Sequence, residues 1–380
     1  MRSGERPRYL LIDALRGLAA LAVVGFHAHA GNHVAALEPQ LPLALRKVLE
    51  HGNAGVTMFF VISGFAIANT LVYKRMTPGY VGRFLARRSV RLDPPYWASM
   101  GFAILMGIAA VRLVPGKVYH LPTWTDILVH VAYLPDLLQR PLISDVYWTL
   151  CLEVQFYLSF SLLLVLVTKL EPRLGRERAL SAVLWPAVAV SNLWLLGLIP
   201  GEVPGLFIGF WYLFLTGVLV WRGVVRAGEG DFSHAAVAAA ELLLLAGVAS
   251  AHGDVPQLVA FATGALVLGA GLAGKLQTWL RQRPFQLLGA ISYSLYLTHN
   301  QITGALFRVG YKLTGRTAAW EAFWMVAVVG ACVGFAWLFF RLFEAPSIVL
   351  SKKIPMPDRT NVPPPAATPR LSPSQGAGLG

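Results

Sequence analysis

Residues 14–27 read ALRGLAALAVVGFH, and apart from Arg16 and His27 every residue in this stretch is Ala, Leu, Val, Gly or Phe. Such a run is typical of a membrane-spanning helix, yet hydrocarbon disfavours both of these polar side chains. Eleven residues of α-helix complete about three turns plus roughly 20°, so the two side chains share one face, about 16 Å apart along the axis. Because ionisable groups inside a span usually mark a functional interior, the stretch predicts a membrane helix that carries part of a site.

The rest of the chain has the same apolar character. Of its 380 residues, 56% are hydrophobic and 13% are charged, whereas a soluble domain has about 25% charged residues. The apolar runs are continuous rather than alternating, so they predict helices and not a barrel. We therefore expect an all-α, polytopic transmembrane helix bundle of about ten spans. The predicted spans are Leu10–Ala30, Asn53–Tyr73, Pro95–Val114, Val146–Thr168, Ser181–Ile199, Leu206–Val224, His234–Ala251, Gln257–Ala273, Phe285–Leu306 and Ala319–Leu342.

The positive charges indicate the orientation of the bundle. The formal net charge is +13, and with the N-terminus inside, 23 of the 32 Lys and Arg residues fall in cytoplasmic segments and 8 in outer segments. Cytoplasmic loops of membrane proteins carry this excess, so both termini are expected in the cytoplasm. The excess is explained by topology, and no nucleic-acid partner is expected.

The composition changes near the C-terminus. We expect residues 1–348 to form one transmembrane domain, with the last helix stopped by Pro346, which follows Glu344 and Ala345. Residues 349–380 become rich in Pro, Ser and Gly, which predicts a disordered cytoplasmic tail. Cys151 and Cys332 lie in apolar runs and are expected to pack as small side chains, and we expect no metal site.

Two groups of charged residues allow two interpretations each. Asp13 lies one turn before Arg16 and can pair with it, either as an interfacial ion pair or as part of a functional interior. Arg88 and Arg91, at i and i+3, either anchor the chain at the cytoplasmic face or present two guanidinium groups to phosphates.

Three further spans contain polar residues. Glu153 lies about two turns inside an apolar helix, where a carboxylate needs a partner or a water-filled cavity. Ser63 and Gly64, in GVTMFFVISGFAI (55–67), permit close helix packing or belong to a site. The ninth span holds an unusually polar stretch, SYSLYLTHNQ (292–301), which includes Ser292, Tyr293, Tyr296, His299 and Asn300.

Taken together and in this order, these segments resemble the acyltransferase 3 family of integral membrane acyltransferases. The resemblance covers about residues 8–348 and is carried by LIDALRGLAALAVVGFH, FFVISGF, RRSVRLDPPYW, YWTLCLEVQFY, SYSLYLTH and FEAP. It implies ten transmembrane helices, an acyl-CoA donor at the cytoplasmic side and transfer to a hydroxyl, commonly of a carbohydrate. It also implies a bundle-only form without a fused hydrolase-like domain.

The resemblance also implies roles for individual residues. Arg16 and His27 match the first-helix pair, Arg88 and Arg91 the Arg-x-x-Arg pair, and Glu153 the carboxylate of the fourth-span motif. The remaining positions with positioning or structural roles are Asp13, Ser63, Gly64, Phe65, Trp148, Tyr157, Ser292, Tyr293 and His299. This chain also departs from the family pattern: Thr149 and Cys151 replace two serines, Val154 replaces a second glutamate, and Gln301 stands where many relatives have proline.

These features lead to a hypothesis of O-acyl transfer inside the membrane. A neutral imidazole can remove a proton from an attacking hydroxyl near pH 7, so His27 is the expected base. Arg88 and Arg91, joined by Arg16, are expected to bind the phosphates of CoA. Glu153 is expected either to orient His27 or to hold a donor cation. A covalent acyl-histidine route stays open.

The expected partners follow from this hypothesis. The co-substrate is acyl-CoA, expected as acetyl-CoA, and no tightly bound cofactor is expected. The other expected partners are a carbohydrate acceptor, membrane lipids and glycan-assembly proteins. The acceptor is either an exopolysaccharide, lipopolysaccharide or lipid-linked glycan precursor, or a small glycosylated natural product. The expected location is the bacterial inner membrane. A transporter or flippase is the alternative from another class of protein, since intramembrane charge also marks translocation paths. A third alternative is an electron carrier that binds haem through His27, His29 and His299.

Overall fold

The computed structural model describes residues 8–113, 118–199 and 204–356, and within these ranges the chain forms helices and no strands. The all-α prediction is therefore confirmed. The helices are α1 (Leu10–Ala30), α2 (Leu43–Glu50), α3 (Gly55–Leu71), α4 (Pro78–Leu113), α5 (Trp124–Val131), α6 (Trp148–Leu174), α7 (Arg176–Leu195), α8 (Trp211–Gly228), α9 (Ser233–His252), α10 (Val255–Leu272), α11 (Arg283–Thr314), α12 (Ala318–Phe339) and α13 (Ala345–Lys352).

Nine helical segments in the described ranges are long and apolar enough to cross a membrane. They coincide with nine of the ten predicted spans. The remaining predicted span, Phe285–Leu306, is ninth in chain order and lies within α11. The 32 residues of α11 exceed the roughly 20 residues that a span requires. α11 does not meet the same apolar standard because its middle carries the polar stretch that includes His299.

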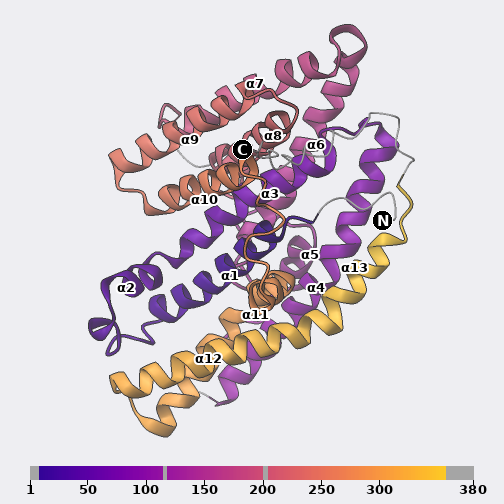
Figure 1. The fold of residues 1–380 in the computed structure, drawn as a ribbon. Helices are drawn as coiled ribbons and strands as arrows, with labels where there is room; N and C mark the ends of the chain where they lie inside the picture. Colours follow the sequence, from indigo (N-terminus) through magenta and orange to yellow (C-terminus); the bar gives the residue numbers. More distant parts are fainter. Residues whose placement is uncertain (1–7, 114–117, 200–203, 357–380) are drawn as a thin grey trace, which may run out of the picture.

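Helices α1 and α11 run along each other at the centre of the bundle (Figure 1). α12 packs on the other side of α11, while α3 packs against both α1 and α8. Helices α7, α9 and α10 lie on one side of α1, and α12 and α13 lie on the other (Figure 1). The polar helix α11 therefore lies between apolar helices, which is where a membrane protein places its ionisable groups.

Glycines allow the central helices to approach closely. A Cβ atom on Gly64 of α3 would lie 1.9 Å from the carbonyl oxygen of Phe214 in α8, and one on Gly217 would lie 2.0 Å from that of Val61. A Cβ atom on Gly17 of α1 would lie 2.6 Å from the backbone nitrogen of Gly289 in α11. Small residues at helix contacts are a general feature of membrane bundles. The packing role considered for Gly64 is thus present in the structure.

Two proline-containing segments differ from the prediction. α4 begins at Pro78 and continues through Pro94 and Pro95, so the third predicted span is the second half of a longer helix. The Tyr293 hydroxyl donates a hydrogen bond to the carbonyl of Leu92 (3.1 Å) next to these prolines. The bond ties α11 to α4 beside the carbonyls of Val90 and Arg91, whose helical N–H donors the two prolines lack.

The prediction that Pro346 ends the last helix was wrong. A π-helical turn, Phe340–Glu344, follows α12, and Pro346 lies in the first turn of α13, where a proline needs no backbone N–H. The helix therefore runs to Lys352, beyond the predicted domain boundary at residue 348, and residues 349–352 do not belong to a disordered tail. Residues 357–380 of the predicted tail lie outside the described residues.

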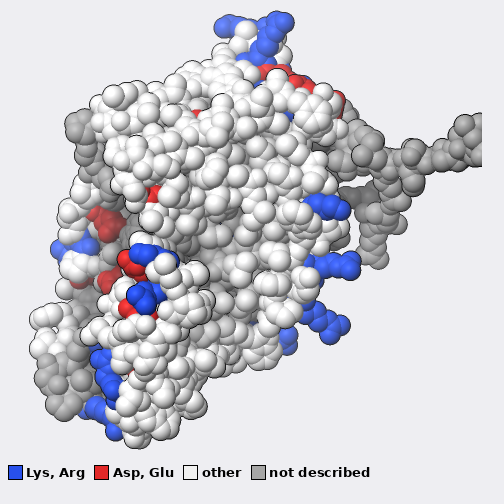
Figure 2. All heavy atoms as spheres, turned by 60° about the vertical axis from the view of Figure 1, so that its left-hand side comes forward, with Lys and Arg blue, Asp and Glu red and all other residues white. Residues whose placement is uncertain are grey.

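The surface of the bundle fits a lipid environment. Figure 2 shows a broad face that is almost free of charged side chains, with Lys, Arg, Asp and Glu gathered at its margins. Large apolar side chains such as Leu162, Leu243 and Val326 are exposed. In water an apolar surface of this extent would be a liability, whereas in a bilayer it is the expected lipid contact.

Candidate active site

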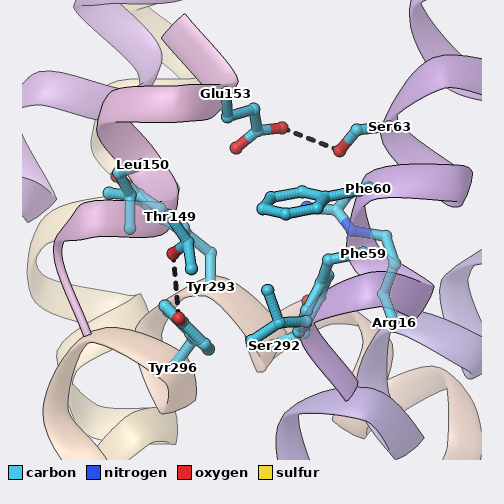
Figure 3. Close-up of a pocket in the computed structure, with 11 residues that line it drawn as sticks. Arg16, Phe59, Phe60, Ser63, Thr149, Leu150, Glu153, Ser292, Tyr293 and Tyr296 are labelled. Carbon is cyan, nitrogen blue, oxygen red and sulfur yellow. Dashed lines mark hydrogen bonds between the residues drawn. The ribbon is translucent and has the colours of Figure 1, made fainter. Parts of the chain in front are cut away.

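Helices α1, α3, α6 and α11 enclose a cavity of about 50 Å³, which we call the inner cavity (Figure 3). Arg16 comes from α1, Ser63 from α3 and Glu153 from α6. Two hydrogen bonds between helices, Glu153 with Ser63 and Thr149 with Tyr296, lie in its wall (Figure 3). The other lining residues are Val56, Phe59, Phe60, Leu150, Ser292 and Tyr293.

Glu153 joins three helices beside this cavity. Its carboxylate accepts a hydrogen bond from Ser63 (2.8 Å) on α3 and from the Tyr157 hydroxyl one turn further along α6. The Arg88 guanidinium of α4 lies 3.4 Å from the same oxygen and 3.9 Å from the centre of the Tyr157 ring. Glu153 thus holds a cation, the second of the two roles expected for it, and among the described residues it makes no hydrogen bond with His27.

Two further arginines near this carboxylate have no paired charge. Neither Arg16 nor Arg91 makes a hydrogen bond or an ion pair with another described residue, and the Nε atom of Arg91 is buried without a partner. Arg91 lies within electrostatic range of Arg16, Glu153 and Glu344. An unpaired guanidinium out of water is costly, so these groups are suited to bind an anion.

Glu344 is a carboxylate of this region for which the sequence suggested no role. It is buried and accepts a hydrogen bond from Ser294 (2.6 Å) of α11. The π-helical turn that ends at Glu344 places the carboxylate within electrostatic range of Arg91 and Arg16. Such turns often occur at functional sites, and the motif FEAP was the only signal for this one.

His27 lies at the other end of α1 and contacts a second histidine. Its Nδ1 atom lies 2.9 Å from the Val23 carbonyl oxygen and 3.2 Å from Nε2 of His299. The Nδ1 atom of His299 lies within 3.0 Å of the carbonyl oxygens of Leu295 and Tyr296. Carbonyls only accept, so we assign the proton to Nδ1 in both rings. Nε2 of His27 then keeps its lone pair, as a base requires.

His27 lines a second and larger cavity of about 580 Å³, which we call the outer cavity. Helices α1, α4 and α11 form it together with the segments at residues 31–33 and 143–145. His33 also lines it, and burial, together with the charges of Arg308 and Arg316, lowers the pKa of this histidine, which favours its neutral form. Arg16 and His27 therefore share one helix but line different cavities.

The structure corrects or sharpens several expectations about single residues. Asp13 does not pair with Arg16; it forms an ion pair with Arg8 (2.5 Å), which reaches it from the segment preceding α1. Phe65 and Trp148 belong to the apolar core and are not among the residues that line the inner cavity.

The substituted positions of the fourth-span motif behave differently from one another. Thr149 keeps a hydroxyl in the inner cavity and shares a hydrogen bond with the Tyr296 hydroxyl (2.8 Å). Cys151 is buried, and its sulfur contacts the Tyr147 carbonyl oxygen (3.4 Å). Neither Cys151 nor Val154 lines the cavity. None of the three substitutions therefore removes a polar group from the wall of the inner cavity.

Sequence comparison identifies the family to which this arrangement belongs. The profile of the acyltransferase domain family Acyl_transf_3 matches residues 9–341. The chain belongs to the acyltransferase 3 family. It is a membrane acyltransferase, and the resemblance drawn from its motifs is confirmed.

Relatives of known name agree with this assignment. Acyltransferase MdmB from Streptomyces mycarofaciens is 26% identical over 86% of each chain. O-acetyltransferase OatA from Staphylococcus aureus is 25% identical over 78% of this chain and 51% of its own length. Peptidoglycan O-acetyltransferase OatA from Listeria monocytogenes is 26% identical over 50% of this chain and 30% of its own. The chain thus spans about half the length of the staphylococcal relative. No solved structure matches it.

Proposed function

We propose that this acyltransferase moves an acetyl group from acetyl-CoA to a hydroxyl of a carbohydrate at the bacterial cell membrane. The observation that carries the proposal is that the two ends of α1 place different chemical groups in two different cavities. Arg16 lines the inner cavity, Arg88 is paired with Glu153 of its wall, and His27 lines the outer cavity with a free ring nitrogen. One end of the site is thus suited to an anionic donor and the other to a hydroxyl acceptor.

The donor end has the chemistry that binds phosphates. Arg16 and Arg91 have no paired charge among the described residues, and Glu153 holds Arg88 in place. Guanidinium groups bind phosphate oxygens through paired hydrogen bonds. We assign the CoA phosphates to this end, which the charge distribution of the chain orients toward the cytoplasm.

The acceptor end supplies the base. Nε2 of His27 removes the proton from the acceptor hydroxyl, and the hydroxyl oxygen attacks the carbonyl carbon of the thioester. The C–S bond then breaks, the ester forms, and the CoA sulfur leaves with its electron pair and takes up a proton. The thioester supplies the driving force, so the protein contributes position and proton transfer.

Tyr296 and His299 occupy the region between the two cavities. Tyr296 lines the inner cavity, and its ring centre lies 5.7 Å from that of Phe59 and 5.9 Å from that of His299. His299 in turn contacts His27 of the outer cavity. We propose that the acetyl end of the donor passes these rings to reach the hydroxyl.

The proposal is tested first on the donor side. Arg88→Ala/Arg91→Ala is compared with Arg83→Ala/Arg87→Ala, which removes the same charge from the same helix at positions that form no ion pair with Glu153 among the described residues. With labelled acetyl-CoA and membranes of equal protein content, we expect the KM for acetyl-CoA to rise about tenfold or more in the first variant only. An unchanged KM in that variant contradicts the donor assignment.

A further inference from the structure

The outer cavity combines an apolar wall with a polar one. α4 contributes apolar residues to its wall, among them Ala103, Met106 and Ala110. Most of the polar groups come from α11 and from the segment at residues 143–145. The volume of about 580 Å³ falls within the roughly 300–1,000 Å³ of small-molecule sites, so the cavity has room for sugar rings.

Two cations on the polar wall have no counter-charge. Arg308 and Lys312 lie four residues apart on α11, on one face of the helix. Neither makes an ion pair or hydrogen bond with another residue of the described ranges, whereas the nearby Arg316 is paired with Glu321 (2.9 Å). Asp145 is the carboxylate among the lining residues, and with His33 neutral the lining carries an excess of positive charge.

The same wall offers free hydrogen-bond acceptors. Gln301 donates from Nε2 to the Ser144 hydroxyl (2.9 Å), and its Oε1 atom is buried without a partner. Asn300 and Asp145 line the cavity beside it without a bonded partner among the described residues. Asn300 is half-buried and Asp145 is exposed, whereas the buried Gln301 Oε1 atom needs a donor, which a sugar hydroxyl can supply.

Because an exposed cationic pair and several hydrogen-bond acceptors line the same cavity as the proposed base, we infer that the acceptor is an anionic sugar. Its hydroxyls would donate to Gln301 and Asp145, and a carboxylate or phosphate substituent would bind Arg308 and Lys312. The inference rests on the proposed function and adds the substrate class to it. It also assigns Gln301, Arg308 and Lys312 to acceptor selection.

The first test measures binding without turnover. Diethyl pyrocarbonate modifies accessible imidazoles, and mass spectrometry gives the rate at His27 in the purified protein. Two oligosaccharides are compared, one that contains glucuronate and its carboxyl-reduced, neutral form. We expect the glucuronate form to slow the modification of His27 at a concentration at least tenfold lower than the neutral form requires. A phosphorylated derivative of the reduced form shows whether phosphate serves as well as carboxylate. Equal protection by the charged and neutral sugars, or none by any, overturns the inference.

Variants then test the residues. In Arg308→Gln/Lys312→Gln the preference for the charged sugar is expected to disappear, and in Gln301→Ala protection by all the sugars is expected to weaken. Arg46→Gln/Lys47→Gln removes two cations from α2, which packs against α1 but does not line the cavity, and is expected to keep the preference. If the α2 variant loses the preference equally, the effect is general surface charge and the inference fails.

A transfer assay separates this inference from the proposed function. Transfer of labelled acetyl to the charged and neutral sugars with the same KM supports the function and overturns the inference. Charge-selective protection of His27 without any transfer supports an anionic-sugar site and contradicts the function. The protection assay is repeated in vesicles of neutral lipid, with and without added phosphatidylglycerol. If the preference for the charged sugar appears only with phosphatidylglycerol, the cationic pair binds anionic lipid, and that result also overturns the inference.

Discussion

At the scale of single residues, the contact between His27 and His299 explains how an imidazole at this depth can act as a base. His299 accepts the Nδ1 proton of His27 and is itself fixed by two backbone carbonyls. The sequence predicted His27 from its spacing to Arg16, and it identified His299 only as part of a polar stretch. No pattern in one sequence shows that residues 272 positions apart are in contact.

Replacing His299 tests this contact. In His299→Ala the Nδ1 proton of His27 loses a partner, and we expect kcat to fall on the order of tenfold with little change in the KM for acetyl-CoA. His299→Gln supplies a carbonyl oxygen that can accept the same proton, so its kcat should be substantially higher than that of the alanine variant. Equal activity of the two variants, or a change confined to KM, would show that His299 only fills space.

At the scale of helices, hydropathy predicted where the spans lie but not how they continue. α4 and the α12–α13 run are both longer than predicted, because Pro95 and Pro346 do not end their helices. Pro346 lies in the first turn of α13, where it needs no backbone N–H, and a π-helical turn joins α13 to α12. Helix pairing was also not predictable, although Gly64 suggested one position where two helices lie close together.

The contact between α3 and α8 gives a prediction for stability. Gly64→Ala places a Cβ atom against the backbone of Phe214, which cannot move without shifting α8. We expect the free energy of unfolding to fall by about 1–3 kcal/mol. Gly330→Ala in α12, where a Cβ atom meets nothing within 4 Å, should leave stability equal or slightly higher. Thermal unfolding of the two variants in the same detergent is the measurement, and equal melting temperatures would contradict the packing described.

At the scale of the whole molecule, the arrangement of two cavities along one face of α1 relates the fold to the reaction. The sequence predicted a polar interior with arginines at one end and a histidine at the other. It could not show that Arg308 and Lys312, which read as ordinary charges outside the spans, line the cavity at His27. Their position depends on how α11 packs against α1 and α4, which is a property of the folded bundle.

The most direct test of the account is the acetyl-transfer rate of His27→Ala compared with that of His29→Ala. His29 lies on the same helix two residues away, contacts Glu38 (2.5 Å) and does not line the outer cavity. With equal amounts of protein in membranes, the account predicts a loss of about 100-fold or more for His27→Ala and near-normal transfer for His29→Ala. Near-normal transfer by His27→Ala would contradict the assignment of His27 as the base.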